Sequence, residues 1–217
     1  MKIELKINEI HSQAIKKQKS ENFVDAKYLY SKILEINPSH LSALNNLGLV
    51  FQSLRDFNKA KNCYEKAIKI NPTIAATHYN LGTTYLELRE IEIAINCYEK
   101  AIKINSNYVE AYNNLGYAFH LSKKYQKAKN CYEKAIEIDP NYLDAYRNLA
   151  LTFKSIGEIQ KVMNCYEKAL KIDPLQKKTF VAYGRSLLDL NQHLKGLKYI
   201  AKGEGLVKFA YSYFKII

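Results

Sequence analysis

The sequence is poor in residues that interrupt helices: its 217 residues include only eight glycines and four prolines. Because 47% of the residues are apolar, a folded core is expected, and a disordered segment is excluded. No apolar run approaches the roughly eighteen residues that a membrane-spanning helix needs. The N-terminal stretch MKIELKINEIHSQAIKKQKS has too many charges for a secretory signal. These absences predict a cytoplasmic protein.

Motifs for catalysis and for cofactors are also missing. The sequence has no dinucleotide fingerprint, no phosphate-binding P-loop and no GxSxG nucleophile motif. Its five histidines are scattered, without a metal-ligand spacing, at His11, His40, His78, His120 and His193. We therefore expect no enzyme activity, no cofactor and no metal site.

The four cysteines argue against disulfides. Each lies in one of four copies of NCYEKA, which start 34 residues apart at Asn62, Asn96, Asn130 and Asn164. Equivalent residues of stacked helical repeats are separated by at least the roughly 8–10 Å between neighbouring helix axes, whereas a disulfide needs Cα atoms within about 7 Å. We expect small packing residues, with a reactive thiol as the alternative.

The same 34-residue spacing governs the prolines. Pro38, Pro72, Pro140 and Pro174 share one register, and Ser106 takes the remaining place. Each proline follows Asn or Asp, and a residue before proline leaves the helical conformation, so a helix ends there. We expect the Asn or Asp to cap the start of the next helix. Between prolines, the apolar spacing predicts two antiparallel helices per unit.

The residues of one unit resemble those of the tetratricopeptide repeat. The matching pattern is Leu44-x2-Leu47-Gly48-x2-Phe51, followed by Ala60-x3-Tyr64, Ala67 and Pro72. It recurs in residues 41–74, 75–108, 109–142 and 143–176, and more weakly in residues 7–40 and 177–202. The resemblance implies an all-α, right-handed solenoid of stacked antiparallel helix pairs, a TPR-like superhelix, over residues 1–202.

Large and small side chains alternate in a way that suggests how the helices pack. Each NCYEKA copy carries a tyrosine, and three units carry a glycine in the first helix, at Gly48, Gly82 and Gly116. We expect each ring to be buried and each glycine to mark a close approach of helices. Overpacking such a crossing, as in Gly82→Leu, costs about 1–3 kcal/mol.

The resemblance also implies a function, which is a scaffold that binds an extended peptide or a partner's helix in a concave groove lined by the first helices. Helical spacing places four asparagines, 34 residues apart, opposite the packing stripe. Amides can grip a peptide main chain because they both donate and accept hydrogen bonds. The expected contact residues are Asn46, Asn80, Asn114 and Asn148, with Tyr79, Leu86, Asn113, Tyr117, His120 and Arg147 beside them.

Several alternatives remain open at this stage. The asparagines could instead bridge neighbouring helices, and Asn148 with Lys178 could clamp a terminal carboxylate. A net charge of +12 raises nucleic acid or an anionic surface as partners. We consider nucleic acid unlikely because most of the surplus lysines fall on the second helices, on the expected convex face. Residues 203–217 could form a cap, a junction to a further domain or a surface for self-association.

Overall fold

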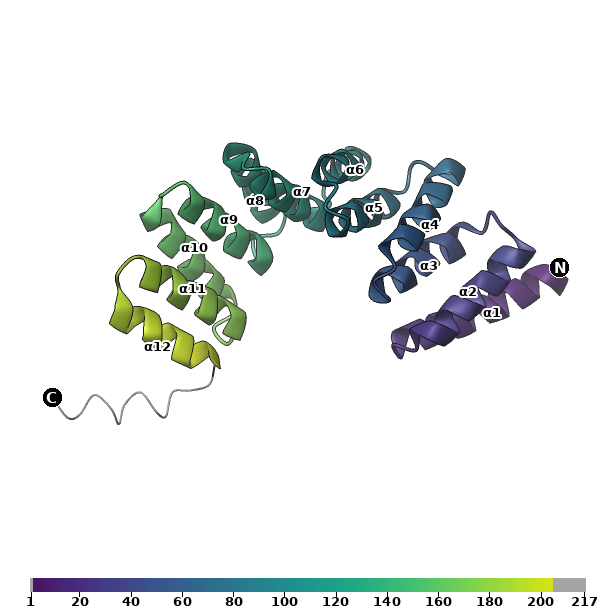
Figure 1. Cartoon of the computed structure of the whole chain (residues 1–217), viewed down its shortest axis with the longest axis horizontal. Helices are drawn as coiled ribbons and strands as arrows, with labels where there is room; N and C mark the ends of the chain where they lie inside the picture. Colours follow the sequence, from purple (N-terminus) through teal and green to yellow (C-terminus); the bar gives the residue numbers. More distant parts are fainter. Residues whose placement is uncertain (1, 205–217) are drawn as a thin grey trace. The chain divides into compact units, whose positions relative to one another are not determined.

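The computed structural model describes residues 2–204, which form twelve α-helices and contain no strand. The helices follow one another in pairs joined by short turns, which confirms the predicted all-α repeat solenoid (Figure 1). The helices are α1 (Lys2–Lys19), α2 (Phe23–Ile36), α3 (Leu41–Ser53), α4 (Phe57–Ile70), α5 (Ala75–Glu87), α6 (Ile91–Ile104), α7 (Val109–Leu121), α8 (Tyr125–Ile138), α9 (Leu143–Ser155), α10 (Ile159–Ile172), α11 (Lys177–Asp189) and α12 (His193–Glu204). None of these helices is both long enough and apolar enough to cross a bilayer.

The chain divides into two compact units inside α7. Unit 1 comprises Met1–Ala111 and holds α1 to α6, and unit 2 begins at Tyr112 and holds most of α7 and the helices up to α12. The sequence predicted a single array over residues 1–202. Most of the C-terminal segment expected to cap the array, residues 205–217, lies outside the described residues.

The turn inside each pair contains one residue in the left-handed conformation. These residues recur every 34 positions, with φ between 57° and 77°, at Glu21, Arg55, Arg89, Lys123, Gly157 and Asn191. In the turn after α3, the Asp56 N–H donates to the Phe51 carbonyl at 2.9 Å, as in a Schellman motif. Only one of the six residues is glycine, so residue type alone does not indicate this conformation.

The Asn and Asp residues before the proline positions end helices instead of starting them. Asn37, Asn71, Asn105, Asp139 and Asp173 occupy the C-cap positions with extended backbone. Each side-chain oxygen accepts the backbone N–H two residues later, at 2.9–3.1 Å. This Asx turn satisfies the side chain locally. The expectation that these residues cap the next helix is therefore wrong, because the next helix begins further along the chain.

In the pairs α3–α4, α5–α6 and α7–α8, a tyrosine ring of the second helix packs against a glycine of the first helix. Tyr64, Tyr98 and Tyr132 are essentially inaccessible to solvent, as predicted. A Cβ atom on Gly82 would lie 2.8 Å from Tyr98 Cε1, and similar contacts of 2.6 and 2.7 Å exist at Gly48 and Gly116. Real Cβ atoms almost never come that close to another heavy atom. These glycines are therefore required by the close approach of the rings.

Lysines of the second helices cover aromatic rings of the first helices. The ammonium group lies 5.3–5.6 Å from the ring centroid, within the range of a cation–π contact, in three pairs with the same spacing: Lys59 over Phe51, Lys127 over Phe119 and Lys161 over Phe153. Part of the positive charge on the second helices thus has a partner within the fold.

The cysteines of the repeated hexapeptide are free thiols, and Cys63, Cys97 and Cys165 are buried. Burial raises the pKa of each of these three thiols to about 11. Because the thiolate is the reactive form, these side chains are poorly suited to chemistry near neutral pH. Their burial agrees with the predicted packing role.

Candidate binding faces

The predicted contact residues lie on the first helices, and each unit holds its own set. Unit 1 contains Asn46, Tyr79, Asn80 and Leu86, whereas unit 2 contains Asn113, Asn114, Tyr117, His120, Arg147 and Asn148. Tyr117 is exposed and Asn113 is buried. The other eight side chains are half-buried.

Asn46 on α3 belongs to a polar cluster that joins the first three helices of unit 1. Its Nδ2 lies 3.4 Å from Nε2 of His11 on α1. The His11 ring also contacts the rings of Tyr30 and His40, with centroids 5.8 and 5.4 Å away. His40 in turn caps α3, because its Nδ1 accepts the Ala43 N–H at 3.1 Å. Burial and then the charge of His40 lower the pKa of His11.

Asn80 on α5 differs from Asn46 because its side-chain amide makes no hydrogen bond to any residue in the described range. Its backbone carbonyl is engaged and accepts from Gln52 Nε2 at 3.1 Å and from Thr84 Oγ1 at 2.8 Å. The backbone of Asn80 is thus fixed, while the donor and acceptor of its half-buried side-chain amide remain available for hydrogen bonds. Such an amide is suited to a peptide main chain.

Tyr79, next to Asn80, is held by two other rings of unit 1. Its centroid lies 5.0 Å from that of Tyr108 and 5.8 Å from that of Tyr98. Burial, with smaller contributions from Tyr79 and Glu110, raises the pKa of Tyr108 to about 12. The Tyr79 ring therefore has a defined position and remains partly accessible.

In unit 2, the asparagines form a chain of hydrogen bonds. Asn148 Nδ2 on α9 donates to Asn113 Oδ1 on α7 at 2.9 Å, and Asn113 Nδ2 donates to Asn114 Oδ1 at 3.2 Å. Because Asn113 is only 6% exposed, it supports its two neighbours and does not itself present an amide to a ligand. The bridging role considered from the sequence is thus observed here.

Arg147 and His120 also connect neighbouring helices. Arg147 pairs with Asp144 and donates to Gln176, which is the residue before α11. His120 Nδ1 lies 2.9 Å from Thr152 Oγ1, and burial lowers the pKa of His120. In unit 1, Gln52 occupies the position of His120 and donates to Thr84 at 2.9 Å. The sequence analysis did not foresee these links, although a polar residue meets a hydroxyl residue 32 positions later in both.

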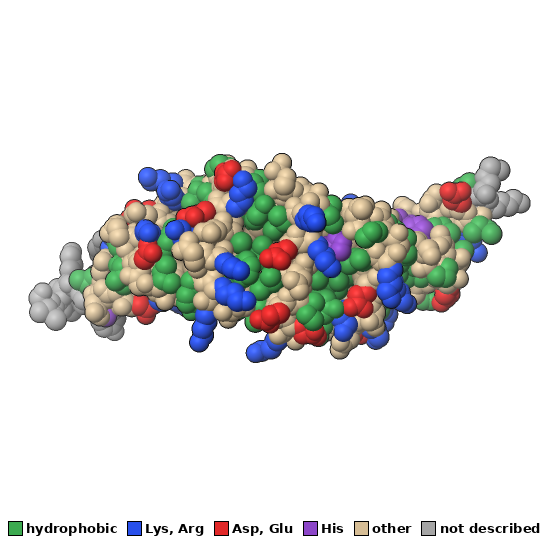
Figure 2. Space-filling model, turned by 90° about the horizontal axis from the view of Figure 1, so that it is seen from above, with side chains coloured by type: hydrophobic (Ala, Val, Ile, Leu, Met, Phe, Trp, Pro, Cys, Tyr) green, Lys and Arg blue, Asp and Glu red, His purple; other side chains and the backbone are tan. Residues whose placement is uncertain are grey.

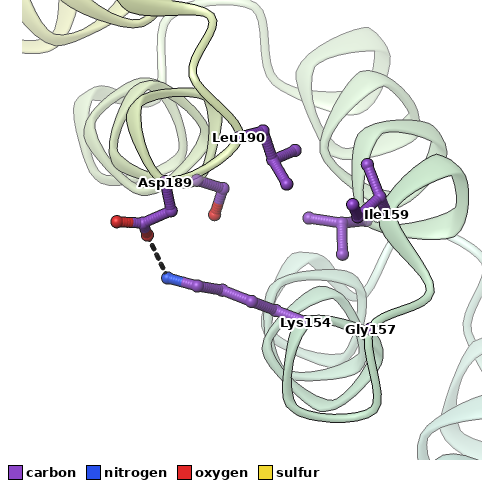
Figure 3. Close-up of a pocket in the computed structure, with 7 residues that line it drawn as sticks. Lys154, Gly157, Ile159, Asp189 and Leu190 are labelled. Atoms are coloured by element: carbon purple, nitrogen blue, oxygen red, sulfur yellow. Dashed lines mark hydrogen bonds and ion pairs between the residues drawn. The ribbon is translucent and has the colours of Figure 1, made fainter.

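A small pocket in unit 2 was not predicted from the sequence. It has a volume of about 240 Å³ and is lined by Gly157, Ile159, Val162, Ser186 and Leu190, with the ion pair between Lys154 and Asp189 at one side (Figure 3). Ligand pockets usually measure about 300–1,000 Å³. We assign no ligand to this pocket because it is smaller than that range.

Within residues 2–204, no group of three or more His, Cys, Asp or Glu side chains is arranged to hold a metal ion. The features that recur in both units are instead polar and aromatic side chains on the first helices.

Three family models match the chain. Two are described as tetratricopeptide repeat, and they match residues 42–74 and 109–142, and residues 63–96 and 131–162, respectively. The third, described as TPR repeat, matches residues 84–123. Together they span residues 42–162, which is more than half of the chain. The chain belongs to the tetratricopeptide repeat family.

Solved structures of three other proteins have a similar fold. MamA is 28% identical with a TM-score of 0.70, and the match covers 74% of this chain and 94% of MamA. PilW, described as a widely conserved type IV pilus biogenesis factor, is 17% identical with a TM-score of 0.83, covering 96% and 95% of the two chains. YrrB, described as a TPR protein with an unusual peptide-binding site, is 18% identical with a TM-score of 0.63, covering 84% and 94%. No curated protein matches the chain.

Proposed function

We propose that this tetratricopeptide repeat protein is a scaffold that binds other proteins through the exposed faces of its first helices. The observation that carries the proposal is the amide of Asn80, which is half-buried, set on a fixed backbone and without a hydrogen-bond partner within the described chain. An amide held in that way is costly to desolvate unless a ligand satisfies it. The similar fold of YrrB, which is described as a TPR protein with an unusual peptide-binding site, supports a peptide as the ligand.

The distribution of charge favours a protein over a nucleic acid. Lys and Arg side chains on the face in Figure 2 are interspersed with Asp, Glu and apolar side chains, and they form no continuous basic surface there. Helices α3 and α5 of unit 1 carry a single charged residue between them, Glu87. A phosphate backbone is bound by several lysines or arginines at once, which these two helices lack.

The proposal is tested with Asn80→Ala, and Asn96→Ala on α6 serves as the control because Asn96 is an exposed asparagine on a second helix. Neither change removes an internal hydrogen bond of the described chain, so both variants should keep the melting temperature of the wild type. Proteins retained from a lysate by the wild type at two salt concentrations are identified by mass spectrometry. We expect a protein that survives the higher salt to be retained by Asn96→Ala and reduced with Asn80→Ala. Equal retention by both variants would reject this face as the binding site.

A further inference from the structure

The first helices of unit 2 expose a set of side chains that unit 1 does not have. We call Tyr117 and Leu121 on α7, Leu151 on α9, and Lys178 and Arg185 on α11 the apolar–basic strip. All five are exposed, and the three apolar ones are 44%, 43% and 45% accessible. In α3 and α5 of unit 1, the positions 34 or 68 residues before these apolar residues carry no exposed apolar side chain. They are occupied by Leu49, which is half-buried, and by Ser53, Thr83 and Glu87.

Hydrogen bonds and an ion pair establish that the strip is continuous across three helices. Helix α9 is joined to α7 by the bond from Asn148 to Asn113. It is joined to α11 by the ion pair between Lys154 and Asp189. Helix α9 therefore lies between α7 and α11, and Leu151 lies between Tyr117 and Arg185, each 34 residues apart in the sequence.

The cations of the strip have no counter-charge in the fold. Lys178 and Arg185 make no ion pair with any residue from 2 to 204. The carboxylates on α9 and α11 are already used, because Asp144 pairs with Arg147 and Asp189 pairs with Lys154. Exposed apolar side chains next to uncompensated cations are complementary to an apolar group followed by a carboxylate.

The spacing of the strip sets the spacing of its ligand. Axes of packed helices are about 8–10 Å apart, and an extended peptide advances about 3.3 Å per residue. One helix-to-helix step therefore corresponds to about three residues of peptide. An apolar side chain resting against Leu151 places the residue about three positions away near Arg185.

We propose that the apolar–basic strip binds an extended segment of a partner protein in which an apolar or aromatic residue is followed or preceded, about three residues away, by an internal Asp or Glu. This specificity rests on the proposed function of the first-helix faces and adds the chemistry of the partner to it. The carboxylate belongs to a side chain within the segment, and a chain-terminal carboxylate is the competing source that the experiment separates.

The test is a selection of random twelve-residue peptides, displayed at the N-terminus of a phage coat protein, on the full-length chain. The selection is repeated with Arg185→Glu and with Lys168→Glu, which makes the same charge change on an exposed position of α10. We expect the wild type and Lys168→Glu to enrich peptides with an acidic residue two to four positions from Phe, Tyr, Leu or Ile. Arg185→Glu should lose that enrichment.

The most enriched peptide is then synthesised with a fluorophore and an amidated C-terminus for anisotropy titrations. We expect roughly tenfold weaker binding to Arg185→Glu and a loss of a few-fold with Leu151→Ser, while Lys168→Glu binds like the wild type. Binding that requires a free C-terminal carboxylate would overturn the proposal, as would equal affinity of the Arg185 and Lys168 variants. Selected peptides without acidic residues would overturn the specificity alone, whereas no enrichment here or from a library displayed with free C-termini would reject the proposed peptide-binding function as well.

Discussion

A Cβ atom built on Gly82 lies 2.8 Å from Cε1 of Tyr98, so the ring occupies the space that any larger residue would need. The same contact is made at Gly48 with Tyr64 and at Gly116 with Tyr132. In these three helix pairs, a ring of the second helix fills the space that a side chain on the first helix would need.

Replacing Gly82 with leucine should destabilise the protein by about 1–3 kcal/mol, because the Tyr98 ring must move to make room. Thermal unfolding of Gly82→Leu measures the effect. Ala76→Leu, at an exposed position of the same helix, is the control for the added side chain. Equal melting temperatures for the two variants would contradict the role of the glycine.

The left-handed turn position predicts opposite effects at two sites. Gly157 has φ of 77°, so Gly157→Ala should cost about 1 kcal/mol, because a Cβ atom is strained there. Lys123 adopts φ of 58° with a side chain present, and Lys123→Gly should stabilise the protein by several tenths of a kcal/mol. Urea unfolding of both variants checks the signs, and destabilisation by Lys123→Gly would be the contrary result.

The buried thiols predict a loss of stability in alkali. The pKa of Cys63, Cys97 and Cys165 is raised to about 11 in the folded state, whereas an unfolded thiol titrates near 8.5. The contribution of these protonated thiols to the free energy of unfolding is complete below their pKa in the unfolded chain. It is lost as pH rises through their pKa in the folded protein. The urea midpoint should therefore fall between pH 8 and pH 10.5.

A variant with alanine at these three cysteines should show a shallower fall, since only the tyrosines with raised pKa remain. Iodoacetamide labelling gives an independent measurement, and at pH 8 the three thiols should react much more slowly in buffer than in urea. Fast labelling of the folded chain would show that these thiols are accessible.

The cluster around His11 predicts a loss of stability in acid. The pKa of His11 is lowered, so its stabilising contribution is present above the unfolded pKa of about 6.5 and is lost as pH falls through the folded value. The groups in contact with the ring are His40, Tyr30 and Asn46. The protection of the α1 amides against exchange, relative to the intrinsic rate at each pH, should therefore fall between pH 7 and pH 5.5.

In His11→Gln, which keeps a polar group beside Asn46 but cannot titrate, this loss of protection should be smaller. His120, whose pKa is also lowered, lies in unit 2 and should affect the exchange of α7 and α9 in both proteins alike. The same pH response of α1 in wild type and His11→Gln would assign the effect to other groups.

The helix pairs, the buried tyrosines and the close contact at Gly82 could be predicted from the sequence, because periodic apolar residues report the face that packs. The left-handed residues could not, since Glu21, Arg55 and Arg89 do not favour that conformation by themselves and the tertiary fold imposes it. The caps were assigned to the wrong helix because Asn and Asp favour both N-caps and Asx turns.

The binding faces were predictable only as a pattern of positions. The 34-residue spacing made Asn46 and Asn80 equivalent, although the amide of Asn46 contacts His11 on α1 and the amide of Asn80 makes no hydrogen bond within the described residues. That difference depends on which residue faces them from the adjacent helix. A repeat pattern specifies a position once per unit and does not specify the neighbour there.

The hydrogen bonds between neighbouring helix pairs constrain the order of the repeats. In the three pairs closed by a tyrosine and a glycine, both residues lie inside the pair, so these 34-residue modules are interchangeable as far as their own cores are concerned. The contacts between modules differ from one border to the next. Thr77 donates to Asn45 at 2.8 Å, and a transposed module beginning with α7 would bring Ala111 to that place and lose the bond. The order of the modules is therefore constrained by the side-chain contacts between neighbouring modules, because each such contact needs a particular residue on both sides.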